Sequence, residues 1–93
     1  MFKKVLLVED EALIALSEAQ ILKNHGFEVE IAYSGRQAIE KTEADEEINL
    51  VLMDIDLGNG MDGTAAAEQI IKARDLPIVF LTSHTEREYI DRV

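Results

Sequence analysis

Unbroken runs of hydrophobic residues mark three predicted strands in this chain. They cover residues 5–8, 50–53 and 78–81, with no polar position inside any run. Such runs are typical of strands that are covered on both faces, as in a parallel sheet between helices. Residues 27–32 instead alternate between apolar and acidic positions, which indicates a strand with one wet face or edge. We therefore expect a parallel sheet with the 27–32 strand at its edge.

Helix signals lie between these strands. Residues 12–25 are rich in helix-forming residues and contain neither glycine nor proline, and Gly26 supplies a stop. Ser34 and Gln37 have the spacing of a capping box, which opens a helix to about residue 44. Two more helices are expected after the second and third apolar runs, at about 64–74 and from 85 onward. This alternation predicts an α/β fold with right-handed crossovers.

Composition narrows the class of protein. The 93 residues predict one domain over positions 1–93, with 47% hydrophobic residues to form its core. The absence of cysteine fits a reducing, cytoplasmic compartment, and no apolar stretch reaches the length of a membrane span. A net charge of −10 argues against nucleic-acid contact by this domain. The same charge is compatible with a cation site or a basic partner surface.

Polar side chains follow three of the predicted strands. Glu9 and Asp10 come after the first strand, Asp54 after the third and Thr82 after the fourth. Because the carboxyl ends of parallel strands meet at one edge of a sheet, we expect these side chains to converge there. Two like charges about 4 Å apart repel by roughly 4 kcal/mol at an effective dielectric constant of 20. Mg²⁺ would offset this repulsion, because it prefers oxygen ligands and suits a site with few carboxylates.

Each of these residues also has a simpler structural interpretation. Asp10 could cap the first helix, Asp54 could be a turn residue, and Thr82 could be an ordinary hydroxyl at a strand end. Their coincidence at one edge favours a site over these separate explanations. An aspartate beside Mg²⁺ with a hydroxyl nearby is equipped to accept a phosphoryl group on its own carboxylate.

The glycine-rich stretch after the third strand does not match a known phosphate-binding motif. Three of the five glycines, Gly58, Gly60 and Gly63, crowd into it. The stretch lacks the spacing of a dinucleotide fingerprint and the lysine of a Walker loop. We interpret these glycines as a source of turn flexibility.

Four segments together resemble the receiver domain of two-component response regulators. They are Val5–Glu11, Leu50–Asp54, Gly60–Gly63 and Val79–Ser83. The resemblance extends over the whole chain. It implies a flavodoxin-like three-layer sandwich with a parallel sheet of strand order 2-1-3-4-5, and this order agrees with the edge position expected for the second strand.

The resemblance also implies roles for individual residues. Asp54 is similar to the phosphoacceptor, which would receive a phosphoryl group from a sensor histidine kinase or a phosphotransfer protein. Glu9 and Asp10 are similar to the acidic pair that binds Mg²⁺ together with Asp54, and the backbone carbonyl of Asp56 would be a further ligand. Thr82 is similar to the switch hydroxyl. Such a domain changes conformation on phosphorylation and is not a turnover enzyme.

The chain also departs from the family pattern. The family's lysine and aromatic switch residue lie on or after a fifth strand, which this sequence does not reach. We therefore expect the domain to be incomplete at its C-terminal end, without the fifth strand and its helix. The fourth strand would then be an apolar edge that can pair with a second copy, giving a homodimer.

Two other classes share parts of the pattern. Asp54-Ile55-Asp56 resembles the nucleophile motif of haloacid-dehalogenase-type phosphatases, but in those enzymes the motif lies on the first strand. That interpretation leaves Glu9 and Asp10 unexplained. A small flavin-binding module would need a glycine- and hydroxyl-rich loop after the first strand, which is absent here. The receiver interpretation accounts for all three strand ends.

Overall fold

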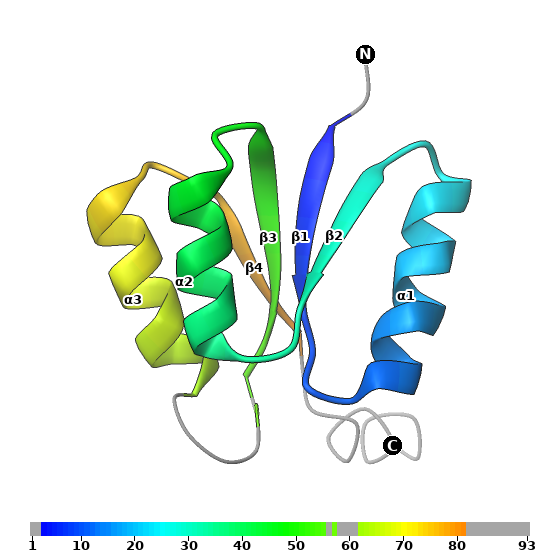
Figure 1. Cartoon of the computed structure of the whole chain (residues 1–93), viewed down its shortest axis with the longest axis horizontal. Coiled ribbons are helices and arrows are strands. Elements are labelled where there is room, and N and C mark those ends of the chain that lie inside the picture. Colours follow the sequence, from blue (N-terminus) through cyan, green and yellow to red (C-terminus); the bar gives the residue numbers. More distant parts are fainter. Residues whose placement is uncertain (1–2, 56, 58–61, 82–93) are drawn as a thin grey trace, which may run out of the picture.

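The computed structural model describes residues 3–55, 57 and 62–81. Strands and helices alternate along this range, as the hydrophobic pattern predicted (Figure 1). The elements are β1 (Lys4–Val8), α1 (Ala12–Asn24), β2 (Glu28–Ala32), α2 (Gly35–Ala44), β3 (Ile48–Asp54), α3 (Gly63–Ala73) and β4 (Ile78–Leu81). The fourth helix expected from residue 85 lies outside the described residues.

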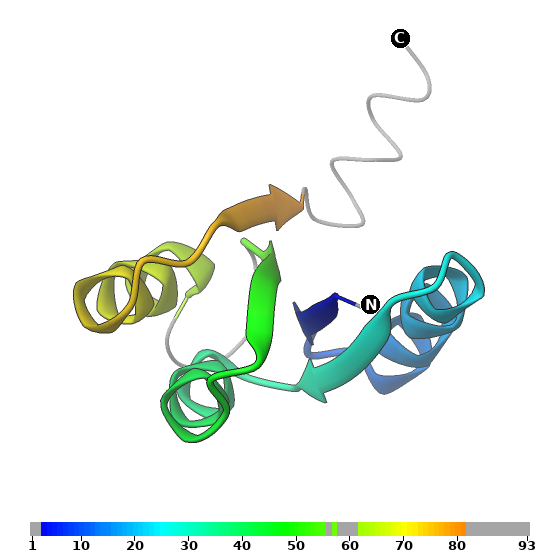
Figure 2. The same ribbon diagram turned by 90° about the horizontal axis from the view of Figure 1, so that it is seen from above.

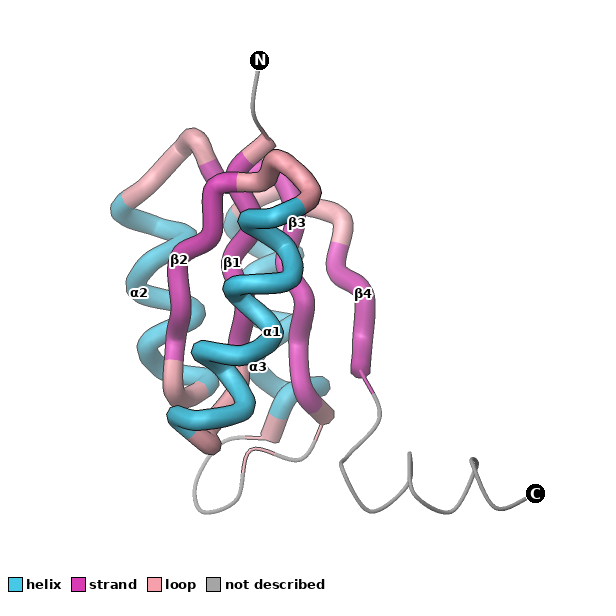
Figure 3. The backbone as a smooth tube through the Cα atoms, turned by 90° about the vertical axis from the view of Figure 1, so that its right-hand side faces the viewer, coloured by secondary structure: helices cyan, strands magenta, loops and turns pink. Residues whose placement is uncertain are grey.

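The four strands form one parallel sheet of order β2-β1-β3-β4. This is the flavodoxin-like order predicted from the sequence as far as β4, and it confirms β2 as an edge strand. Helix α1 covers one face of the sheet, and α2 and α3 cover the other (Figure 2). All strands run in the same direction, so their carboxyl ends lie together at one edge (Figure 3). The strand order reverses between β1 and β3, where parallel sheets place their ligand sites.

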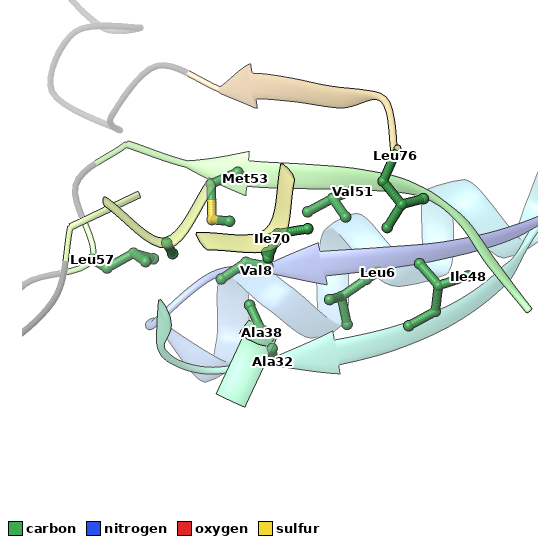
Figure 4. Close-up of a cluster of buried hydrophobic side chains, with 11 residues drawn as sticks. Leu6, Val8, Ala32, Ala38, Ile48, Val51, Met53, Leu57, Ile70 and Leu76 are labelled. Carbon is green, nitrogen blue, oxygen red and sulfur yellow. The ribbon is translucent and has the colours of Figure 1, made fainter. Parts of the chain in front are cut away.

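The main core lies between the sheet and the pair α2 and α3. Alternate residues of the central strands point into it, and small or branched residues of the helices pack against them (Figure 4). Its members are Leu6, Val8, Ala32, Ala38, Ile48, Val51, Met53, Leu57, Ala66, Ile70 and Leu76. The intervening residues of β1, Val5 and Leu7, are fully buried as well. This burial on both faces explains why the sequence of β1 is an unbroken apolar run.

The fully buried residues of helix α1 are small, and several of its large apolar residues are exposed. Ala15 and Ala19 are its buried positions, whereas Leu13 is 82% exposed and Leu16 and Ile21 are also exposed. No clean apolar stripe is visible in the sequence of this helix, and the structure shows why. The alanines allow the helix to lie close to the sheet, while the larger apolar side chains are half-buried or exposed.

The predicted helix boundaries have visible causes. The Ser34 hydroxyl accepts a hydrogen bond from the Gln37 amide at 3.1 Å, and the Gln37 side chain accepts one from the Tyr33 amide at 2.9 Å. The reciprocal bond thus reaches one residue before the cap and not the cap itself, which is a variant of the capping box. Gly26 has a φ of +92°, a conformation that favours glycine, and it follows the end of α1 as predicted.

Arg74, directly after α3, connects the end of this helix to segments that come much earlier in the sequence. Its guanidinium donates hydrogen bonds to four backbone carbonyl groups at 2.9–3.1 Å. The acceptors are Thr42, Asp45, Glu46 and Ile48. One side chain therefore ties the end of α3 to the end of α2 and the first residue of β3.

Replacing Arg74 should destabilise the domain markedly. Arg74→Ala leaves four carbonyl groups without their charged donor, and hydrogen bonds of this kind support a loss on the order of 2 kcal/mol in unfolding free energy. Arg74→Lys should recover only part of it, because an ammonium group lacks the planar fork of the guanidinium. Urea unfolding measures both, with Lys72→Ala on the exposed surface of the same helix as the control. A loss no larger than that of Lys72→Ala would contradict this role.

Candidate metal centre at the carboxyl ends of the strands

Three carboxylates converge at the carboxyl edge of the sheet. Glu9 and Asp10 follow β1 directly, and Asp54 is the last residue of β3. These two strands are neighbours, and Val8 pairs with Met53. Glu9 and Asp54, the residues that follow this pair, therefore lie side by side. One carboxylate oxygen of Glu9, Asp10 and Asp54 each lies within 4.8 Å of the others. The structure thus brings together the three acidic side chains that the sequence placed at this edge.

The three side chains differ in their exposure to solvent. Glu9 and Asp54 are 4% and 5% exposed, whereas Asp10 is exposed. The Glu9 amide donates to the Ala32 carbonyl at 3.0 Å, which holds this position against β2. One Glu9 carboxylate oxygen accepts a hydrogen bond from the Glu11 amide at 3.2 Å. The cluster therefore has a buried part, fixed by backbone contacts, and a part open to solvent.

Burial beside Asp54 makes a negative charge on the Glu9 carboxyl unfavourable. Desolvation, followed by a hydrogen bond shared with the Asp54 carboxylate, raises the pKa of Glu9 to about 8, although the Glu11 amide opposes the shift. The nearby negative charges of Asp54 and Glu18 add to the rise in this pKa. At neutral pH the cluster thus holds a proton, which reduces the repulsion between carboxylates. A bound cation would remove the need for that proton.

The opposite end of the sheet shows how carboxylates are neutralised elsewhere in the fold. Lys4 forms ion pairs with Asp45 and Glu30, and Lys41 forms one with Glu30 at 2.8 Å. These lysines lower the pKa of both carboxyl groups. No lysine or arginine within the described range forms an ion pair with Glu9 or Asp10. Within the described residues, the carboxylates at the two ends of the sheet therefore lie in different electrostatic environments.

Mg²⁺ fits the donor set that the chain offers. The ligand atoms are carboxylate oxygens, which are hard donors, and only three side chains supply them among the described residues. Ca²⁺ usually takes six to eight oxygen ligands, whereas Mg²⁺ commonly binds through one or two carboxylates and keeps several waters. The exposed side of Asp10 leaves an open approach for such waters. Glu9, Asp10 and Asp54 are therefore the residues that would hold the ion.

Two of the predicted site residues lie outside the part of the chain that the structure describes. They are Asp56, whose carbonyl was expected to be a metal ligand, and Thr82, the expected switch hydroxyl. Leu81, which precedes Thr82 in the chain, pairs with Asp54 across β3 and β4. The roles of Asp56 and Thr82 stay predictions.

The sequence interpretation of Gly63 was wrong. Gly63 is the first residue of α3 and is buried against the end of β3, so it is not a source of turn flexibility. Asp62 caps the same helix by accepting a hydrogen bond from the Ala65 amide at 2.8 Å. The only signal in the sequence was an Asp-Gly pair before a helix of small residues. That pair predicts a helix start but not its contact with β3.

The shifted Glu9 pKa predicts how stability depends on pH in the presence of EDTA. The folded protein holds the Glu9 proton up to about pH 8, while the unfolded chain releases it near 4.5. Between these values the folded state binds more protons, so the contribution of Glu9 to the unfolding free energy falls as the pH rises. Glu9→Gln cannot titrate and should lack this fall. Urea unfolding at several pH values measures the difference, and parallel profiles for the two proteins would contradict it.

Comparison with known proteins places the chain among signalling domains. The family model for the response regulator receiver domain matches residues 5–93. The transcriptional regulatory protein PdtaR of Mycobacterium tuberculosis is 38% identical over 91 residues, which are 97% of this chain and 43% of PdtaR. The chain therefore spans less than half the length of this relative.

Solved structures agree in both sequence and shape. The N-terminal domain of a response regulator/sensory box/GGDEF three-domain protein from Carboxydothermus hydrogenoformans superimposes with a TM-score of 0.84 at 48% identity, covering 89% of this chain and 66% of that one. The response regulator protein TrrA from Thermotoga maritima, solved in complex with Mg²⁺-BeF, gives a TM-score of 0.83 at 30% identity, with 91% and 73% covered. No helix among the described residues is long and apolar enough to cross a membrane. The chain belongs to the response regulator receiver domain family.

Proposed function

We propose that Asp54 is the phosphoacceptor of this receiver domain and that Mg²⁺ binds beside it. The observation that supports this most directly is the meeting of the Asp54 carboxylate with those of Glu9 and Asp10 at the carboxyl edge of the sheet. The similar protein TrrA was solved with Mg²⁺-BeF, which supports Mg²⁺ as the ion. The ligands proposed for it are Glu9, Asp10, Asp54 and the backbone carbonyl of Asp56.

The three carboxylates are suited to different tasks. Glu9 is buried, and its backbone and carboxylate are held by hydrogen bonds to Ala32 and Glu11, so it is suited to holding an ion in a fixed place. Asp10 is exposed and can bind the ion together with its waters. Asp54 ends the central strand β3 and is buried, so its position is set by the sheet. Asp54 is therefore the residue best placed to attack a phosphorus atom along a defined direction.

The transfer step uses the two oxygens of the Asp54 carboxylate for different purposes. One oxygen attacks phosphorus and forms a new P–O bond, while the bond from phosphorus to the donor breaks and its electron pair leaves with the donor. The other oxygen stays available as a metal ligand. When bound, Mg²⁺ would neutralise the charge on the phosphoryl oxygens during transfer. We assign the Thr82 hydroxyl to a hydrogen bond with one of those oxygens after transfer, on the basis of the family resemblance.

The donor and setting follow from the family and remain part of this proposal. The donor is a sensor histidine kinase or a phosphotransfer protein, in the cytoplasm. With a net charge of −10, the domain itself is unsuited to nucleic acid or to an acidic membrane surface. PdtaR is named a transcriptional regulator, but this chain spans 43% of it, so an output of that kind would involve segments beyond the matched part. The domain would be modified and switched without turning over a substrate.

Phosphorylation of Asp54 should be directly observable. Incubation with a small phosphodonor and Mg²⁺ should give a labile acyl phosphate on Asp54, mapped by mass spectrometry of rapidly quenched protein. The label should disappear in Asp54→Asn and in EDTA. Asp10→Ala should require far more Mg²⁺ for the same labelling, because it removes a ligand but not the nucleophile. Glu9→Ala should raise the Mg²⁺ concentration needed for labelling by less than Asp10→Ala does, if Glu9 binds the ion through water.

The same experiment separates the receiver from a phosphatase built on Asp54-Ile55-Asp56. A receiver is labelled about once per molecule, whereas a phosphatase would hydrolyse many equivalents of a generic phosphate ester. The comparisons give no support to the phosphatase alternative, and Asp54 ends β3 and not β1. Labelling that persists in Asp54→Asn, or that is indifferent to EDTA, would refute the assignment of the acceptor.

Association of two copies through β4 is a further expectation. Within the described residues β4 is an edge strand, and Val79 is 48% exposed. Exposed apolar edges favour pairing with other strands, and a charged side chain on the edge opposes it. Chromatography with light scattering should show a dimer that Val79→Lys shifts towards monomer. Leu13→Lys, with the same charge change on the exposed side of α1, should not shift it. A monomeric wild type, or equal effects of both substitutions, would rule out this interface.

A further inference from the structure

Gly63 lies where helix α3 meets the end of β3. Its amide donates a hydrogen bond to the Ile55 carbonyl at 3.1 Å, so the first turn of the helix is joined to the residue after Asp54. Asp62, the residue before it, caps the helix through the Ala65 amide. The start of α3 is therefore fixed by its own cap and by the strand that carries Asp54.

The space at Gly63 admits no side chain. A Cβ atom there would lie 2.2 Å from the Asp54 carbonyl oxygen and 3.0 Å from the Ile55 Cα atom. Both are backbone atoms, so no rotation of a neighbouring side chain can relieve the contact. The φ of Gly63 is not positive, in contrast to that of Gly26. Glycine is therefore required at position 63 for space and not for backbone conformation.

A larger residue at this position must displace either α3 or the backbone of Asp54. The displacement would be close to an ångström, because real Cβ atoms essentially never approach other atoms within 3.0 Å. The carboxylate of Asp54 belongs to the same residue and meets those of Glu9 and Asp10. Mg²⁺ demands near-ideal octahedral geometry, with ligands at roughly 2.0–2.1 Å. A shift of that size would therefore disturb how Asp54 and the β1 carboxylates share one ion.

We propose that Gly63 is a positioning residue for the metal site. By admitting α3 into direct contact with the Asp54 backbone, it fixes the distance between the β3 carboxylate and the two carboxylates of β1. This inference rests on the proposed Mg²⁺ site. It adds that affinity for the ion depends on a residue that contributes no ligand atom.

Isothermal titration with Mg²⁺ tests the proposal, using Gly63→Ala and the matched control Gly26→Ala. Loss of a group that holds a ligand in place typically weakens metal binding by roughly 10–100-fold, so Gly63→Ala should raise the Kd for Mg²⁺ at least about tenfold. Gly26 lies in the α1–β2 turn, at the end of the sheet away from the carboxylates (Figure 1). An added Cβ there meets nothing within 4 Å but is strained at φ +92°. Gly26→Ala should therefore lower the unfolding midpoint and leave the Kd unchanged.

The outcomes separate this inference from the proposed function. A wild type that does not bind Mg²⁺ overturns both. A folded Gly63→Ala with the wild-type Kd overturns only the role of Gly63. An equal rise of the Kd in both variants also overturns it, because general loss of stability would then be the cause.

A measurement on the wild type covers the case in which Gly63→Ala does not fold. If the contact favours Mg²⁺ binding, Mg²⁺ must by linkage favour the contact. Hydrogen exchange of the Gly63 amide should then slow on adding Mg²⁺ by a larger factor than exchange of the Arg74 amide. Arg74 lies just after the far end of α3, and its amide donates to the Ile70 carbonyl. Equal slowing of the two amides, or no slowing at Gly63, would overturn the proposal.

Discussion

The main constraint in this structure is the repulsion between two buried carboxylates, Glu9 and Asp54, which the pairing of β1 with β3 places side by side. The register that pairs Val8 with Met53 closes the core, and the same register places Glu9 beside Asp54. Both side chains are buried, so water cannot screen them, and the pKa of Glu9 rises to about 8. Carboxylates at the other end of the strands have lysine partners that lower their pKa values. An unfavourable pair of buried charges of this kind is typical of a functional site, and the divalent cation that we propose would relieve it.

The position of Asp54 is controlled by α3 as well as by the sheet. At one end of this helix, Gly63 touches the Asp54 backbone and bonds to the Ile55 carbonyl. Beyond its other end, Arg74 bonds to the carbonyl of Ile48, the first residue of β3. The helix therefore spans β3 from start to finish and is attached at both ends. Such a support limits movement of β3 relative to β1, which the strict coordination geometry of the proposed Mg²⁺ site requires.

The features of the molecule that the sequence predicted are those encoded in local pattern. Unbroken apolar runs identified β1, β3 and β4 as strands, although the predicted burial of β4 was wrong, since Val79 and Phe80 are exposed among the described residues. Alternation identified β2 as an edge, and strand ends identified Glu9, Asp10 and Asp54. The features it did not predict depend on contacts between distant segments. The pKa of Glu9 reflects its depth of burial, and the need for glycine at position 63 arises from β3. The four acceptors of Arg74 come from the end of α2, the turn after it and the start of β3. Helix α1 was ambiguous for a related reason: it docks through Ala15 and Ala19, so hydrophobicity does not mark its buried side.

In the proposed site, the repulsion between Glu9 and Asp54 would link metal binding, protonation and phosphorylation. The proposed cation and the Glu9 proton would relieve the same charge, so they would compete, and each would weaken the binding of the other. Phosphorylation of Asp54 would replace a single negative charge with a group that carries about −1.5 to −2 near neutral pH. The demand for a cation at this edge then increases, while a proton on Glu9 becomes a less adequate substitute for it. The added negative charge would therefore strengthen the electrostatic attraction between this edge and the ion. Under the proposed function, the buried pair Glu9 and Asp54 would thus couple phosphorylation to the binding of a cation at this edge of the sheet.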